Sequence, residues 1–94
     1  MKMEFSCDSF DELEFLVGSR EFKYKECEVL AERDSKAIPV IDLVLKSPTG
    51  DYAEIIVRSS GSTGKENFKQ GYYVGELISP EYAIESADLI NAFK

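Results

Sequence analysis

Apolar residues near the N-terminus recur at the spacing of an amphipathic helix. Over residues 9–17, one stripe collects Phe10, Leu13, Leu16 and Val17. Ser9 precedes Glu12 by three residues, which is the form of a capping box that satisfies free amides at a helix start. Gly18 can adopt the left-handed conformation that ends a helix. The pattern therefore predicts a helix over residues 9–17.

The next segment, residues 21–32, changes to the period of two that is typical of a β-strand. It holds two alternating apolar sets that are one residue out of phase: Phe22 and Tyr24, then Cys27, Val29 and Ala31. A β-bulge near residues 25–26 restores the phase and gives one long strand. A helix is the alternative for this segment, because Glu, Lys, Leu and Ala are good helix formers.

A β-hairpin is the clearest prediction. Residues 37–46 and 51–58 are rich in Ile, Val and Leu, and Ser47-Pro48-Thr49-Gly50 separates them. Pro fixes φ at the second turn position, and Gly tolerates the left-handed region at the fourth. This predicts two paired strands joined by a type I turn with a G1 bulge. A further strand is expected over residues 71–78, after a Ser- and Gly-rich loop at residues 59–67.

The C-terminal segment returns to helical spacing. Ser79 is a suitable N-cap, Pro80 fits the first helical position and Glu81 fits the second. The apolar stripe consists of Ala83, Ala87, Ile90 and Phe93. The order α-β-β-β-β-α predicts one small α+β domain over residues 1–94. Its four-stranded antiparallel sheet is a meander, with the N-terminal and C-terminal helices on one face.

The charge balance narrows the class of partner. The chain of 94 residues carries 18 Asp and Glu against 11 Lys and Arg, a net charge of −7. Nucleic acids and anionic membranes require basic surfaces, so direct binding to either is not expected. The charge favours a basic partner protein. The alternative is that acidity only keeps the domain soluble.

The absence of histidine excludes much catalytic chemistry. Without His, the chain lacks the commonest general base and the usual zinc ligand, so no catalytic residue, metal or cofactor is expected. The best carboxylate cluster is Asp42, Glu54 and Glu76, which can share one sheet face. Cross-strand pairing with Lys46 and Arg58 explains such acids without catalysis. The sequence therefore favours a protein that is not an enzyme.

Two further features limit the chemistry and the compartment. The loop at residues 59–67 has Ser59 and Glu66 where a P-loop requires Gly and Ser or Thr. Cys7 and Cys27 have no metal-binding spacing, and neither a signal peptide nor a membrane span is apparent. A reducing cytoplasm with two free thiols is expected.

The predicted N-terminal helix offers a candidate binding surface. In helical projection, Phe15 falls among acidic residues rather than with the apolar stripe. An exposed aromatic ringed by acids can insert into a basic partner, because aromatic anchors often dominate interface energy. The alternative is that Phe15 packs against a neighbouring strand. The expected partner-binding residues are Asp8, Asp11, Glu12, Glu14 and Phe15.

The sheet face away from the helices is a second candidate surface. Alternation places Tyr52, Glu54 and Ile56 on it, and Tyr72 extends it on the next strand. A face that mixes Tyr and Ile with charge resembles an interface more than a fully solvated surface. This predicts a homodimer as readily as a foreign partner. The alternative is that the two faces are reversed.

A small, acidic, histidine-free α+β domain resembles two classes of inhibitor. Phage anti-defence proteins, including anti-CRISPR proteins and other DNA mimics, occupy basic sites on defence nucleases, and immunity proteins neutralise toxic nucleases. The resemblance implies a cytoplasmic inhibitor that covers the basic, nucleic-acid-binding surface of a partner enzyme. The alternative function is a structural or regulatory domain that homodimerises through its sheet face.

Overall fold

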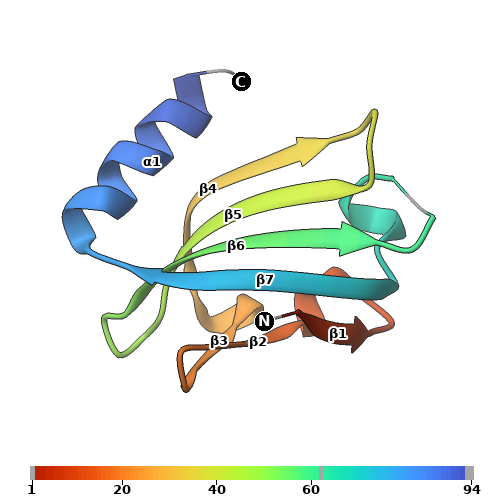
Figure 1. Cartoon of the computed structure of the whole chain (residues 1–94), viewed down its shortest axis with the longest axis horizontal. Helices are drawn as coiled ribbons and strands as arrows, with labels where there is room; N and C mark the ends of the chain where they lie inside the picture. The colour runs from red at the N-terminus through yellow and green to blue at the C-terminus, as the bar shows by residue number, and fades with distance from the viewer. Residues whose placement is uncertain (1, 62, 93–94) are drawn as a thin grey trace.

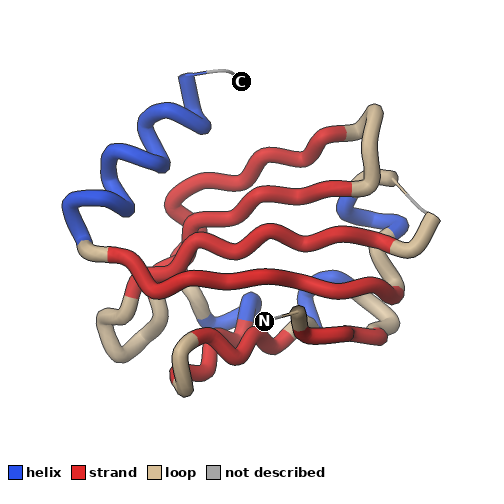
Figure 2. The backbone as a smooth tube through the Cα atoms, in the orientation of Figure 1, coloured by secondary structure: helices blue, strands red, loops and turns tan. Residues whose placement is uncertain are grey.

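Antiparallel strands are the main secondary structure of the chain (Figure 1, Figure 2). The computed structural model describes residues 2–61 and 63–92. One sheet has five strands in the order β1-β7-β6-β5-β4, and a separate hairpin pairs β2 with β3. The elements are β1 (Met3–Ser6), η1 (Phe10–Glu12), β2 (Glu14–Val17), β3 (Arg20–Lys23), η2 (Tyr24–Glu26), β4 (Glu28–Ser35), β5 (Val40–Lys46), β6 (Tyr52–Ser59), η3 (Lys65–Asn67), β7 (Gln70–Ile78) and α1 (Pro80–Ala92).

A meander forms most of the five-stranded sheet. β4, β5, β6 and β7 follow one another along the chain, and each pairs antiparallel with the next. The strands expected over residues 37–46, 51–58 and 71–78 are present as β5, β6 and β7. The expected four-stranded sheet is wrong, because β1 adds a fifth strand along residues 70–73 of β7.

The helix expected over residues 9–17 is also wrong. Ser9 does cap a helical turn, and its Oγ accepts the Asp11 amide at 3.3 Å, but this 3-10 turn ends at Glu12. The chain then extends into β2, whose side chains alternate between exposed and buried. Burial of alternate aromatic and β-branched residues thus outweighs the helical spacing.

A two-residue turn reverses β2 into β3. Gly18 and Ser19 have φ values of 54° and 68°, as a type I′ hairpin turn requires. Phe15 then lies directly opposite Phe22 across the hairpin. Gly18 was expected to adopt a left-handed conformation at a helix end; the conformation is as expected, but it serves a hairpin.

The single strand expected over residues 21–32 is interrupted. β3 and β4 are separate strands, and the 3-10 turn η2 lies between them. The bulge occurs at Leu30 rather than near residues 25–26. Asn91 of α1 donates from Nδ2 to the Leu30 carbonyl O at 3.3 Å, so the bulge contributes to the docking of the helix.

The two faces of the large sheet carry different elements. One face packs against the β2–β3 hairpin in a cluster that includes Phe15, Phe22, Leu43, Ile55 and Phe68. The other packs against α1 through Ala31, Val44, Ala83, Ala87 and Ile90. Two helices on one face are therefore not observed, because the hairpin replaces the first helix. α1 lies on the face that was expected to be open.

The predicted turn and cap residues are confirmed. Gly50 has a φ of 90°, and its amide donates to the Ser47 carbonyl O at 3.0 Å. Ser79 Oγ accepts the Tyr82 amide at 3.1 Å at the start of α1. The expected stripe residues Ala83, Ala87 and Ile90 are buried. Phe93, the fourth stripe residue, lies outside the described residues.

Phe15→Ala is expected to lower the free energy of unfolding by about 3–5 kcal/mol, the usual cost of deleting a buried phenylalanine ring. Phe15 is 0% exposed, and its ring meets Tyr73 edge to face at 4.9 Å. Leu16 is 52% exposed, so Leu16→Ala is the matched control and should cost less than about 1 kcal/mol. Urea unfolding measures both. A larger cost for Leu16→Ala would contradict the strand and favour the helical stripe.

Candidate functional site

Exposed acids gather on the outer side of the β2–β3 hairpin. A shallow depression there is lined by η1, the start of β2, the end of β3 and η2, and its acidic residues are Asp11, Glu12, Glu14 and Glu26. We call these four residues the acidic face. Lys23 and Lys25 line the same depression, so acids outnumber bases.

Backbone pairing fixes the acidic face. The Leu13 carbonyl O accepts the Tyr24 amide at 3.0 Å, which ties the end of η1 to η2. The hairpin register places Glu14 directly opposite Lys23. Lys23 Nζ lies 3.5 Å from the Glu21 carboxylate, and the negative charges of Glu21, Glu26 and Glu14 raise the pKa of Lys23. The lysine within the depression is thus held in its charged form by acids around it.

A polar network links η2 to β4 and η3. The Tyr24 hydroxyl donates to Glu32 Oε1, while Lys65 Nζ donates to the Tyr24 oxygen at 2.8 Å and lies 3.4 Å from Glu32 Oε2. Lys65 Nζ also lies 5.0 Å from the ring centre of Tyr24 and 5.6 Å from that of Phe10. Burial and the bond to Glu32 raise the pKa of Tyr24 to about 12. This network joins η2, β4 and η3, and so makes the base of the acidic face rigid.

The structure brings together part of the predicted partner-binding set. Asp11, Glu12 and Glu14 lie in the acidic face, and Asp8 lines a neighbouring depression that also includes Asp11. Their role as contacts stays a prediction. The expectation of an exposed Phe15 is wrong, because β2 alternates and turns this side chain into the core.

Glu26 is the member of the acidic face that the sequence reasoning missed. It lies in a segment expected to be one continuous strand, where its side chain had no assigned surface. The signal that could have placed Glu26 is the shift by one residue in the alternation of apolar and polar positions between Tyr24 and Cys27. That change marks the 3-10 turn η2, which brings Glu26 beside η1.

The second predicted surface is divided by α1. Pairing along β5, β6 and β7 places Tyr52, Glu54, Ile56 and Tyr72 on one face, as expected. Tyr52 packs at the edge of the cluster under α1, and Glu54 is partly buried. Ile56 remains 36% exposed beyond the helix. Self-association through the uncovered part stays a prediction.

The expected carboxylate cluster lies beside α1. Glu54 is directly opposite Glu76 across β6 and β7, and the Asp42 carboxylate lies near enough for its charge to act on Glu54. Burial raises the pKa of both Asp42 and Glu54, and the nearby charge of Asp42 raises that of Glu54 further. Among the described residues, Lys46 and Arg58 form no ion pair with these acids. Arg33, which lies directly opposite Asp42 across β4 and β5, opposes the rise in the pKa of Asp42. Glu54 is thus the less compensated of these two acids.

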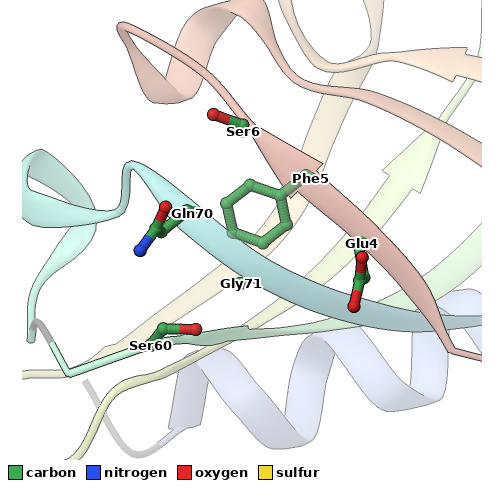
Figure 3. A pocket seen from close by; sticks show the side chains of 6 residues that line it. All are labelled: Glu4, Phe5, Ser6, Ser60, Gln70 and Gly71. Atoms are coloured by element: carbon green, nitrogen blue, oxygen red, sulfur yellow. The ribbon is translucent and has the colours of Figure 1, made fainter.

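Another depression lies beside β1 and is shown in Figure 3. Its lining is Glu4, Phe5, Ser6, Ser60, Gln70 and Gly71. Glu4 is the ionisable side chain in this lining, and the hydroxyls of Ser6 and Ser60 have no basic side chain beside them there. Over residues 2–61 and 63–92, no three Cys, Asp or Glu residues gather in a way that would hold a metal ion. This depression therefore offers no acid–base pair for catalysis.

The comparisons with known proteins assign no family. The chain matches no protein-family model, no curated protein and no solved structure. In the part of the chain that the structure describes, no helix is both long enough and apolar enough to cross a membrane.

Glu54→Gln is expected to stabilise the fold at neutral and alkaline pH. A carboxyl group whose pKa rises on folding binds its proton more tightly in the native state. The free energy of unfolding therefore falls as pH rises from the ordinary pKa through the raised one. Glutamine keeps the size of the side chain without its charge. The Tm of the variant should exceed that of the wild type by a few degrees at about pH 8 and match it at about pH 3.

Glu85→Gln, on the exposed side of α1, is the control for removal of one negative charge. It should change Tm little at either pH. If Glu54→Gln gives no more stabilisation at alkaline than at acidic pH, the fold does not raise the pKa of Glu54.

Proposed function

We propose that this protein is a non-enzymatic inhibitor or adaptor that binds a basic surface of a partner protein through the acidic face. The observation that carries the proposal is the exposure of Asp11, Glu12, Glu14 and Glu26 on one side of a packed hairpin. A patch of one sign steers an oppositely charged partner and raises its association rate. The excess of acid over base on this side therefore favours a partner rich in Lys and Arg.

The hairpin supports binding because it is pre-organised. Phe15 and Phe22 are fully buried beneath it, and the Tyr24, Glu32 and Lys65 network fixes its flank. Groups held in place before association lose less conformational entropy on binding. Acids on this platform can face a basic groove without a change of fold.

A nucleic-acid-binding enzyme is the partner class that we favour. Such enzymes carry the Lys and Arg that neutralise phosphates, and an acidic protein of this size can cover those groups. This is the action of the phage anti-defence and nuclease-immunity proteins that the domain resembles in size and charge. Cys7 and Cys27 are free thiols, which supports a reducing, cytoplasmic location.

Charge reversal on the acidic face is the test. The triple variant Asp11→Lys, Glu12→Lys and Glu14→Lys should weaken the affinity for a partner captured from lysate by about tenfold or more, because it replaces attraction by repulsion. Isothermal titration at two salt concentrations measures the change, and wild-type affinity should fall at high salt.

The matched control is Glu81→Lys, Glu85→Lys and Asp88→Lys on the exposed side of α1. It changes the net charge by the same amount on a different surface, so it should retain most of the affinity. Equal weakening by the two triple variants would show that overall charge alone determines binding and would reject the acidic face. Retained affinity in the acidic-face variant would also reject the acidic face as the binding surface.

A further inference from the structure

The second half of β7 is an open edge of the sheet. β1 pairs only with residues 70–73 of β7, whereas β7 continues to Ile78. Residues 74–78 therefore have β6 on one side and, among the described residues, no strand on the other. Figure 1 shows β1 and the β2–β3 hairpin lying along the β7 side of the sheet.

The direction of the backbone groups at this edge follows from two hydrogen bonds. The Lys69 carbonyl O accepts the Cys7 amide at 2.7 Å on the β1 side, and the Gln70 carbonyl O accepts the Ser60 amide at 3.1 Å on the β6 side. Because successive residues of a strand point to opposite sides, the amides and carbonyls of Gly75 and Leu77 point to the open edge. In the described part of the chain, neither residue has a backbone partner there.

A groove of about 400 Å³ opens at this edge. Met3 lines one end, Leu16 and the Gly18–Ser19 turn form a wall, and Gly75 and Val17 meet in it. A Cβ atom on Gly75 would lie 2.7 Å from Val17 Cγ2, so only glycine allows this close approach.

The flanks of the open edge are apolar. Leu16, Val74 and Leu77 are 52%, 41% and 40% exposed. Leu16 and Leu77 lie on the hairpin side of the sheet, while Val74 lies on the face of α1. Unpaired backbone together with exposed apolar side chains is the surface to which an added strand binds.

The charge at the edge indicates the chemistry of the occupant. Glu76 points to the α1 face and lies directly opposite Glu54, and like charges in this position are destabilising. No ion pair involves Glu76 among the described residues. A cation on a strand added beside β7 would lie opposite Glu76 and compensate its charge. Antiparallel pairing of two copies of this edge would place Glu76 against Glu76 when centred on Glu76, and against Val74 or Ile78 when centred on Gly75 or Leu77. Residues 74–78 hold no cation, so a second copy would not compensate the charge of Glu76 in any of these registers.

We propose that the open edge of β7 receives an extended segment of a basic partner protein, which adds to the sheet as a strand. The Gly75 and Leu77 backbone groups bond to the segment. Its apolar side chains face Leu16 and Leu77, and a Lys or Arg lies opposite Glu76. This shares with the proposed function only the basic partner, because the acidic face is a separate surface.

A peptide of about nine alternating valine and lysine residues is the probe, and its valine–glutamate counterpart is the control. We expect the lysine peptide to bind at least about tenfold more tightly, by fluorescence anisotropy. Binding should slow hydrogen exchange at the Gly75 and Leu77 amides in NMR spectra. Failure of both peptides to bind, or binding without protection of these two amides, overturns the proposal.

Leu77→Pro tests the backbone bonds at the open edge, because proline lacks the amide that Leu77 directs away from β6. The variant should keep the far-UV spectrum of the wild type and lose at least about tenfold in peptide affinity. N-methylation of the peptide amides that face β7 tests the same bonds with the wild-type protein, in case the variant does not fold. Undiminished binding of the N-methylated peptide overturns the proposal.

The acidic-face triple variant separates the two proposals. If the strand adds to β7, this variant should still protect Gly75 and Leu77 when the lysine peptide binds. If peptide binding is lost in this variant and Gly75 and Leu77 stay unprotected in the wild type, the peptide binds the acidic face. That result would support the proposed function and reject the strand addition.

Discussion

The apolar face of the meander is the constraint on which the rest of the structure depends. Six side chains from β5 and β6 on this face are fully buried: Ile41, Leu43, Leu45, Ala53, Ile55 and Val57. A sheet exposes such a face to water at a cost of roughly 25 cal/mol per Å² unless another element covers it. In this chain the N-terminal segment supplies the cover, as a hairpin with Phe15 and Phe22 pointing inward.

The acidic face and the open edge of β7 both result from the way the β2–β3 hairpin covers the sheet. Side chains along β2 alternate between the core and the solvent, so Phe15 points inward and Glu14 points outward. Asp11 and Glu12 of η1 and Glu26 of η2 lie beside Glu14 and complete the acidic face. The hairpin also occupies the space below β7 and packs Val17 against Gly75. Over the described residues β1 pairs with β7 only as far as Tyr73, so the backbone of β7 beyond it has no strand beside it there. The acidic face and the open edge are thus two consequences of how one hairpin covers the sheet.

Uncompensated acid distinguishes the surface of this domain. In the described part of the chain the ion pairs are Lys23 with Glu21 and Lys65 with Glu32, although acids exceed bases by seven. Some acids lie where their charge is costly, as with Glu54 between Asp42 and Glu76. Such charges lower stability unless a partner cation approaches. Both proposals of a basic partner depend on this uncompensated negative charge.

The sequence by itself determined the elements whose signals are local. The Ser47–Gly50 turn, the Ser79 cap, and the strands β5, β6 and β7 depend on turn chemistry, capping and periodicity, which neighbouring residues provide. The carboxylates of Asp42, Glu54 and Glu76 were likewise placed on one face by alternation alone. Only the tertiary structure decided the N-terminal half. Residues 9–17 satisfy both a helical stripe and a strand alternation, and the choice depended on which side chains the sheet could bury. The position of Phe15 in the core, the face covered by α1 and the open edge of β7 follow from long-range packing, which no local pattern contains.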